Sequence, residues 1–120
     1  MTSQGSAYGC FRRALDRGDT LAAMSAAAEL DHVGLGEALE LVLLLAADED
    51  PARFERAALR WHARYCRQAT DVTPAEAQAV LALLWMLPGP RGLQASCALA
   101  QLCDRSGMLS IAELLLRRAR

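Results

Sequence analysis

Two apolar runs constrain what this chain can fold into. Residues 39–47 read LELVLLLAA and residues 79–87 read AVLALLWML. A helix built from either run is apolar nearly all round, and such a helix is stable only where neighbouring elements cover it. Both runs are far shorter than the roughly 20 residues that cross a bilayer, so we expect no membrane association. The two runs are therefore predicted to form the buried centre of a helical protein.

Start and stop signals divide the rest of the chain into helices. Thr73, Pro74 and Glu76 form a capping box, Asp50–Pro51 is a cap followed by a proline at the first helical position, and Asp19 and Ser110 precede further helices. Gly18 and Gly107 end helices, and residues 88–90, Pro-Gly-Pro, form a tight corner. The predicted helices cover about residues 7–17, 20–30, 36–47, 51–69, 74–87, 91–105 and 111–120.

Seven short helices without a strand pattern predict an all-α fold. Successive helices pair as stacked hairpins at intervals of roughly 30–40 residues, close to the period of tetratricopeptide or HEAT repeats, but without the residue pattern of either. The alternatives are an α-solenoid-like array and a compact orthogonal bundle. A chain of 120 residues suits one core, so residues 7–120 are expected to form a single domain behind a flexible tail, residues 1–6.

Helical spacing also predicts which side chains face inward. In the first helix Tyr8 and Phe11 are expected inside and Arg12 outside. The other predicted inward sets are Leu21, Met24, Ala27 and Ala28 in the second helix, and Leu93, Cys97 and Ala100 with Ser96 or Cys103 in the sixth. Trp61 and Trp85 are expected in the core, with anchoring of a partner as the alternative for either one.

The fourth helix, residues 51–69, carries the most specific pattern. Its arginines recur at spacings of three or four, which places them on one side, while Phe54, Trp61 and Tyr65 fall on the other side. The candidate contacts for a partner or for phosphate are Arg53, Arg56, Arg60, Arg64 and Arg67. The alternative is a solvated face whose arginines pair with acidic residues of the first half.

The charge balance weakens a nucleic-acid interpretation. The formal net charge is −1, although residues 1–50 hold nine acidic groups and three arginines, and residues 51–120 hold five acidic groups and ten arginines. All thirteen basic side chains are arginine, which indicates a GC-rich, bacterial genome rather than selection for arginine. The arginines therefore need not have been selected for phosphate recognition.

Residues with catalytic or metal-binding chemistry are scattered. His62 and Cys66 are four apart, as in a thiol–imidazole pair, but core packing is the favoured interpretation. Glu37 and Glu40 are interpreted as the polar edge of an apolar helix. The four cysteines lack zinc-ligand spacing and are expected to be free and buried. No catalytic residue, metal or cofactor is predicted.

Residues 11–90 resemble small uncharacterised helical proteins encoded by actinobacteria. The similarity lies in FRRALDRGDTLAA and LELVLLLAADEDPARFERAALRW, residues 11–23 and 39–61. It implies no activity and assigns no site residue.

The leading functional hypothesis is a non-enzymatic helical domain that binds another protein or itself. The alternative is a nucleic-acid-binding accessory protein that uses the arginines of residues 53–67. Since MTSQGSAYGC lacks a secretory signal, a cytoplasmic location is expected.

Overall fold

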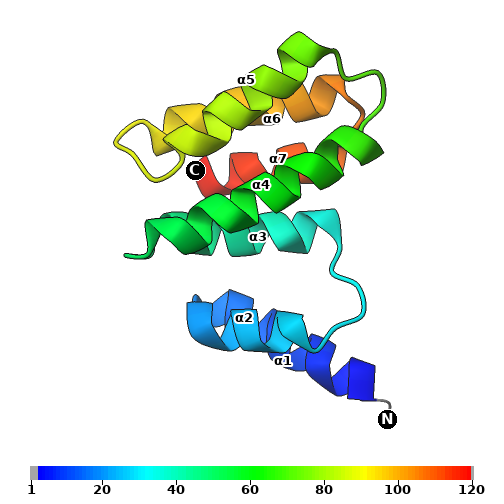
Figure 1. Ribbon diagram of the computed structural model, residues 1–120, viewed down its shortest axis with the longest axis vertical. Coiled ribbons are helices and arrows are strands. Elements are labelled where there is room, and N and C mark those ends of the chain that lie inside the picture. The colour runs from blue at the N-terminus through cyan, green and yellow to red at the C-terminus, as the bar shows by residue number, and fades with distance from the viewer. Residues whose placement is uncertain (1–2, 120) are drawn as a thin grey trace.

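The computed structural model describes residues 3–119, with the side chains of residues 5–118. Within this range the chain forms seven helices and no strand (Figure 1), which confirms the predicted all-α class. The helices are α1 (Ser3–Arg17), α2 (Thr20–Ala28), α3 (Leu35–Ala46), α4 (Pro51–Gln68), α5 (Pro74–Met86), α6 (Gly92–Arg105) and α7 (Leu109–Ala119).

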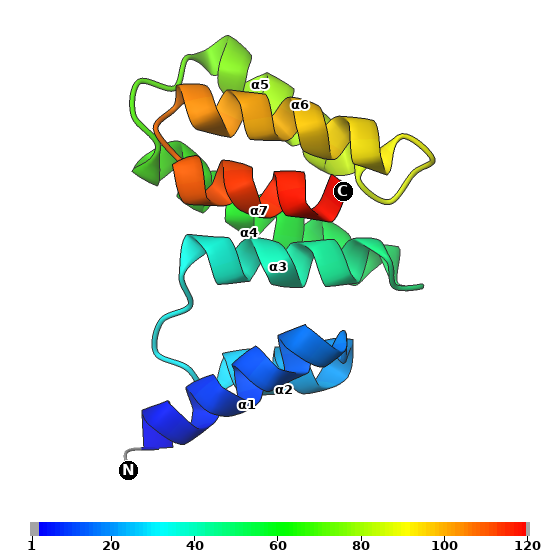
Figure 2. The ribbon, with the colours of Figure 1, turned by 180° about the vertical axis from the view of Figure 1, so that it is seen from behind.

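Three hairpins stack along the long axis, and the last helix closes the stack. The pairs α1–α2, α3–α4 and α5–α6 follow one another in space, as Figure 1 shows. Helix α7 then turns back and lies between α6 and α3 (Figure 2), contacting both. The described residues therefore form a closed bundle of hairpins, with extents of 43 × 30 × 26 Å, rather than an open solenoid.

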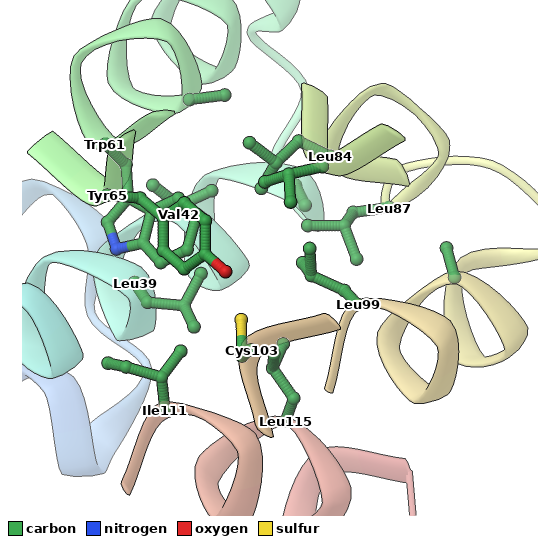
Figure 3. Close-up of a cluster of buried hydrophobic side chains, with 14 of the residues drawn as sticks. Leu39, Val42, Trp61, Tyr65, Leu84, Leu87, Leu99, Cys103, Ile111 and Leu115 are labelled. Carbon is green, nitrogen blue, oxygen red and sulfur yellow. The ribbon is translucent and has the colours of Figure 1, made fainter. Parts of the chain in front are cut away.

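Helix α3 is the central element, as its sequence predicts. Leu39, Val42 and Leu45 are at most 2% exposed and belong to the main core, which α4, α5, α6 and α7 complete (Figure 3). Leu44 packs instead against a smaller cluster built by α1 and α2, and Leu41 contacts both clusters. A helix that is apolar nearly all round is thus covered from both sides.

Polar atoms inside the main core are few and bonded. The indole Nε1–H of Trp61 donates to the carbonyl oxygen of Leu35 at 2.9 Å, and the ring of Trp61 stacks on Tyr65 with centroids 5.2 Å apart. Burial raises the pKa of Cys103 to about 11 and that of Tyr65 to about 12, so both are neutral near pH 7. The cysteines are all free, but only Cys103 is buried, so the predicted burial is wrong for exposed Cys10.

Helix α5 departs from the prediction that its apolar run lies at the centre. It lies at the outer end of the stack and contacts only α4 and α6 among the described helices. Val80 and Leu84 are fully buried, whereas Trp85 is 40% exposed and Met86 is exposed as well. The sequence pattern of a helix shows that it is apolar on nearly every side. It does not show whether other helices pack against each of those sides. The remaining helix, α7, packs between α6 and α3 (Figure 2), so the outer side of α5 has no described helix over it.

Most helix boundaries follow the predicted caps. Asp19 accepts from the N–H of Ala22, Asp50 caps α4 next to Pro51, and Thr73 forms the predicted capping box with Glu76. The predicted cap at Ser110 is wrong, because α7 already begins at Leu109. Gly107, with φ +79°, lets the N–H of Met108 donate to the carbonyl oxygen of Cys103, and this bond closes the end of α6.

Several predicted inward faces are only partly correct: Ser96, Ala100 and Cys103 of α6 are buried as predicted, but other predicted residues are exposed. Tyr8 is 46% exposed, although Phe11 is buried. In α2 the buried residues are Ala23 and Ala26, and Leu21 is exposed. In α6 the buried set is Gly92, Ala95, Ser96, Leu99, Ala100 and Cys103, with Leu93 outside. In α2 and α6, small residues occur on several sides of the helix. The spacing of the apolar residues therefore does not identify the buried side.

The first helix extends further toward the N-terminus than predicted. Helix α1 begins at Ser3 instead of Ala7, so it includes most of the predicted tail. The start of that tail, residues 1–2, and Arg120, expected near the end of the last helix, lie outside the described residues.

Gly92 provides a test of the corner between α5 and α6. A Cβ atom at this buried position would lie 2.4 Å from the carbonyl oxygen of Leu87, a backbone atom that cannot move aside. We expect Gly92→Ala to lower the free energy of unfolding by about 1–3 kcal/mol, measured by urea denaturation. Gly89→Ala is the control, because its Cβ would meet the oxygen of Met86 at an ordinary 3.6 Å. Equal stability of the two variants would contradict this packing.

Candidate functional site

The five predicted arginines of α4 divide into two groups. Two are engaged by neighbours: Arg53 pairs with Asp50 at 3.2 Å, and Arg64 donates to the carbonyl oxygen of Val33 at 2.7 Å. Arg64 thereby ties α4 to the connector between α2 and α3, which is a structural role. A row of arginines in sequence is therefore not one uniform surface in the fold.

The other three arginines form a row on the solvent side of α4. Arg56, Arg60 and Arg67 are exposed, and none of them forms an ion pair with a described residue. At 1.5 Å per residue the row is about 16 Å long. We call these three residues the arginine row; they are the part of the predicted site that is free to contact an anion.

His62 and Cys66 do not have the arrangement that nucleophilic catalysis needs. Nε2 of His62 lies 2.7 Å from the carbonyl oxygen of Ala77 and 3.6 Å from the sulfur of Cys66. A carbonyl only accepts, so Nε2 carries the proton and cannot take one from the thiol. Both side chains are half-buried where α4 meets α5, and Cys66 packs against the main core, as predicted. His62 thereby links α4 to α5.

Glu37 and Glu40 bind an arginine that the sequence places in solvent. Arg12 of α1 donates both terminal nitrogens to Glu40, at 2.7 and 2.8 Å, and also bonds Asp16. Its Nη1 lies 3.7 Å from Oε2 of Glu37, an atom that is buried without a hydrogen bond. Hydrogen bonding to Glu40 raises the pKa of Arg12, and hydrogen bonding to Glu37 raises the pKa of Tyr8. These carboxylates hold α1 to α3 rather than flank a substrate.

A surface hollow lies beside Trp85. It has a volume of about 550 Å³, within the range of roughly 300–1,000 Å³ typical of ligand sites. The end of α3, the start of α4 and the end of α5 meet there. The indole of Trp85 stands edge-on to the ring of buried Phe54, with centroids 6.1 Å apart, and its outer part stays exposed. We call this feature the Trp85 hollow.

The rim of the Trp85 hollow is acidic. Asp48, Glu49 and Glu55 line it, all three are exposed, and no lining residue is basic. None of these three forms an ion pair with any residue between 3 and 119. The C-terminal ends of α3 and α5 also lie at the hollow. The C-terminal end of a helix carries a partial negative charge.

The sequence indicates Trp85 as an alternative anchor for a partner, but it does not predict the hollow beside this residue. Its three walls are far apart in the sequence, and only the stacking of the α3–α4 hairpin on α5 brings them together. The available signal was the acidic stretch of residues 48–50 between two helices, together with a tryptophan near the end of an apolar run.

The described residues include neither a metal-binding cluster nor a membrane-spanning helix. No group of three or more His, Cys, Asp or Glu side chains among them could hold a metal ion. No described helix is both long and apolar enough to cross a bilayer.

No protein-family model, curated protein or solved structure matches this chain. The resemblance to helical proteins of actinobacteria stays a prediction.

Arg12 tests the polar link between α1 and α3. Arg12→Ala removes the bidentate pair with Glu40 and leaves Oε2 of Glu37 buried without a nearby cation. Because the side chain of Arg12 is 32% exposed, we expect a loss of only about 1–2 kcal/mol in urea denaturation. Amide hydrogen exchange should accelerate in α1 and α2 more than in α5 and α6.

The control for this prediction is Arg13→Ala, which removes an exposed neighbour without a carboxylate partner among the described residues. An equal effect of the two substitutions, or uniform acceleration over all helices, would contradict the proposed link.

Proposed function

We propose that this protein is a non-enzymatic helical domain that binds a protein partner through the uncovered end of its stack. The observation that carries the proposal is the position of α5. A helix apolar nearly all round occupies the outer edge, with Trp85 and Met86 exposed. Exposed apolar surface of this kind is typical of interaction sites, and tryptophan is among the residues most enriched where binding energy concentrates.

The Trp85 hollow supplies the shape that such binding needs. Its apolar lining comes from three helices that the core holds in place, so a partner would meet a preformed site. Leu45 and Phe54, at its base, are buried residues of the main core. Little conformational entropy would be lost on the side of this protein.

Affinity capture from the native host tests the proposal. We expect Trp85→Ala to reduce recovery of the bound partner at least about fivefold, because the substitution removes the exposed ring. Leu59→Ala is the matched control: it also removes a large exposed apolar side chain, 49% exposed, but from α4 outside the hollow. Thermal melting of both variants checks that they are folded.

Two results would contradict the proposal. One is recovery that Trp85→Ala leaves at the wild-type level. The other is a protein that stays monomeric in light scattering and retains no partner.

The arginine row favours a second candidate, a nucleic-acid accessory protein. Three exposed arginines on one helix face could each neutralise a phosphate of a duplex. Release of three counterions predicts an affinity that falls about 40-fold between 50 and 200 mM salt.

This candidate predicts that duplex DNA binding, measured by fluorescence anisotropy, is lost when Arg56, Arg60 and Arg67 become Ala. The control is Arg64→Ala, since Arg64 is engaged by the connector. Absent or salt-insensitive binding of the wild-type protein would exclude the candidate.

A further inference from the structure

The Trp85 hollow combines an apolar base with an unbalanced negative rim. Its apolar lining residues include Leu45, Ala46, Pro51, Phe54, Trp85 and Pro88. The nearest cation along the chain, Arg53, is already paired with Asp50, so it does not neutralise the rim.

The backbone adds to the same negative field. The hollow lies at the C-terminal ends of α3 and α5, where helix dipoles favour cations. The N-terminal end of α4 also lies there, with the opposite sign. Asp50 caps that end by accepting from the N–H groups of Ala52 and Arg53, and the same carboxylate pairs with Arg53. The three rim carboxylates and the ends of α3 and α5 outweigh this single N-terminus, so the net field favours a positive ligand.

We propose that the Trp85 hollow binds a basic segment of a partner protein, with one arginine side chain lying against the indole of Trp85. This proposal rests on the function proposed above and specifies the chemistry of the partner. The guanidinium group would stack on the exposed part of the ring and donate to the carboxylates of the rim. Apolar neighbours of that arginine would fill the rest of the base.

Arginine fits these surroundings better than other groups. A carboxylate or phosphate would meet three negative side chains and two helix ends of the same sign. A purely apolar side chain would leave the rim without a counter-charge. Arginine alone offers a planar cation for the ring and several N–H donors for the carboxylates.

A second copy of this chain also presents exposed arginines next to exposed leucines, Arg60 beside Leu59 and Arg117 beside Leu116. A second copy is therefore the competing occupant of the hollow, and the oligomeric state of the charge variant separates it from a basic segment of a partner.

Isothermal titration with two synthetic peptides tests the proposal. The first probe is acetyl-Gly-Leu-Arg-Leu-Arg-Gly-amide, and the second replaces both arginines with citrulline, which keeps the shape and removes the charge. We expect the arginine peptide to bind the full chain with a dissociation constant of about 1 mM or tighter. The citrulline peptide should bind at least about tenfold more weakly.

A charge variant locates the interaction. Asp48→Asn combined with Glu49→Gln and Glu55→Gln should weaken binding of the arginine peptide at least about tenfold. Asp104→Asn combined with Glu113→Gln is the matched control, because these two carboxylates line a similar hollow between α6 and α7 that has no aromatic residue. Binding by the control variant should equal that of the wild type.

Four outcomes would overturn the proposal: equal affinity for the two peptides, no saturable binding, an equal loss in the control variant, or a change of oligomeric state in the charge variant. The last outcome would assign the hollow to a second copy. Capture of a cellular partner that Trp85→Ala abolishes and the charge variant preserves would leave the proposed function standing and reject a basic partner.

Discussion

The structure depends on the burial of α3, a helix that is apolar nearly all round. Burying a leucine or valine side chain stabilises a fold by roughly 1.5–3 kcal/mol, so a helix with apolar residues on every side must be covered on every side. The chain meets this requirement in two ways: α4 and α7 pack on one side, and α1 and α2 on the other. The salt bridge from Arg12 to Glu40 then fixes the outer pair.

The same requirement is not met at α5, and this contrast is the basis for the proposed function. Its apolar run resembles that of α3 in composition, but α7 packs elsewhere and no described helix lies over its outer side. Leu84 is buried, while Trp85, the next residue, stays partly in solvent. Acidic side chains line the same hollow as the exposed ring and make the edge of this surface polar. An apolar patch with a rim of one charge favours a partner of opposite charge.

The sequence predicts local features well because local physics decides them. The caps at Asp50 and Thr73 and the helix count follow from side chains within a few residues of one another. The inward position of Trp61 follows from one helical period. The interaction of Arg12 with Glu40, 28 residues away, depends on how the hairpins stack, which no local pattern encodes. The exposure of Trp85 depends on the same stacking, because it follows from where α7 packs.

The two tryptophans offer the most direct measurement. Their indole N–H groups give separate resonances in a ¹H–¹⁵N NMR spectrum, assigned with Trp85→Phe, and Trp61 is an internal reference because it is buried and bonded to Leu35. On titration with the arginine peptide, the resonance of Trp85 should shift saturably while that of Trp61 stays in place. A stationary Trp85 resonance, with shifts gathered at another surface, would contradict the account.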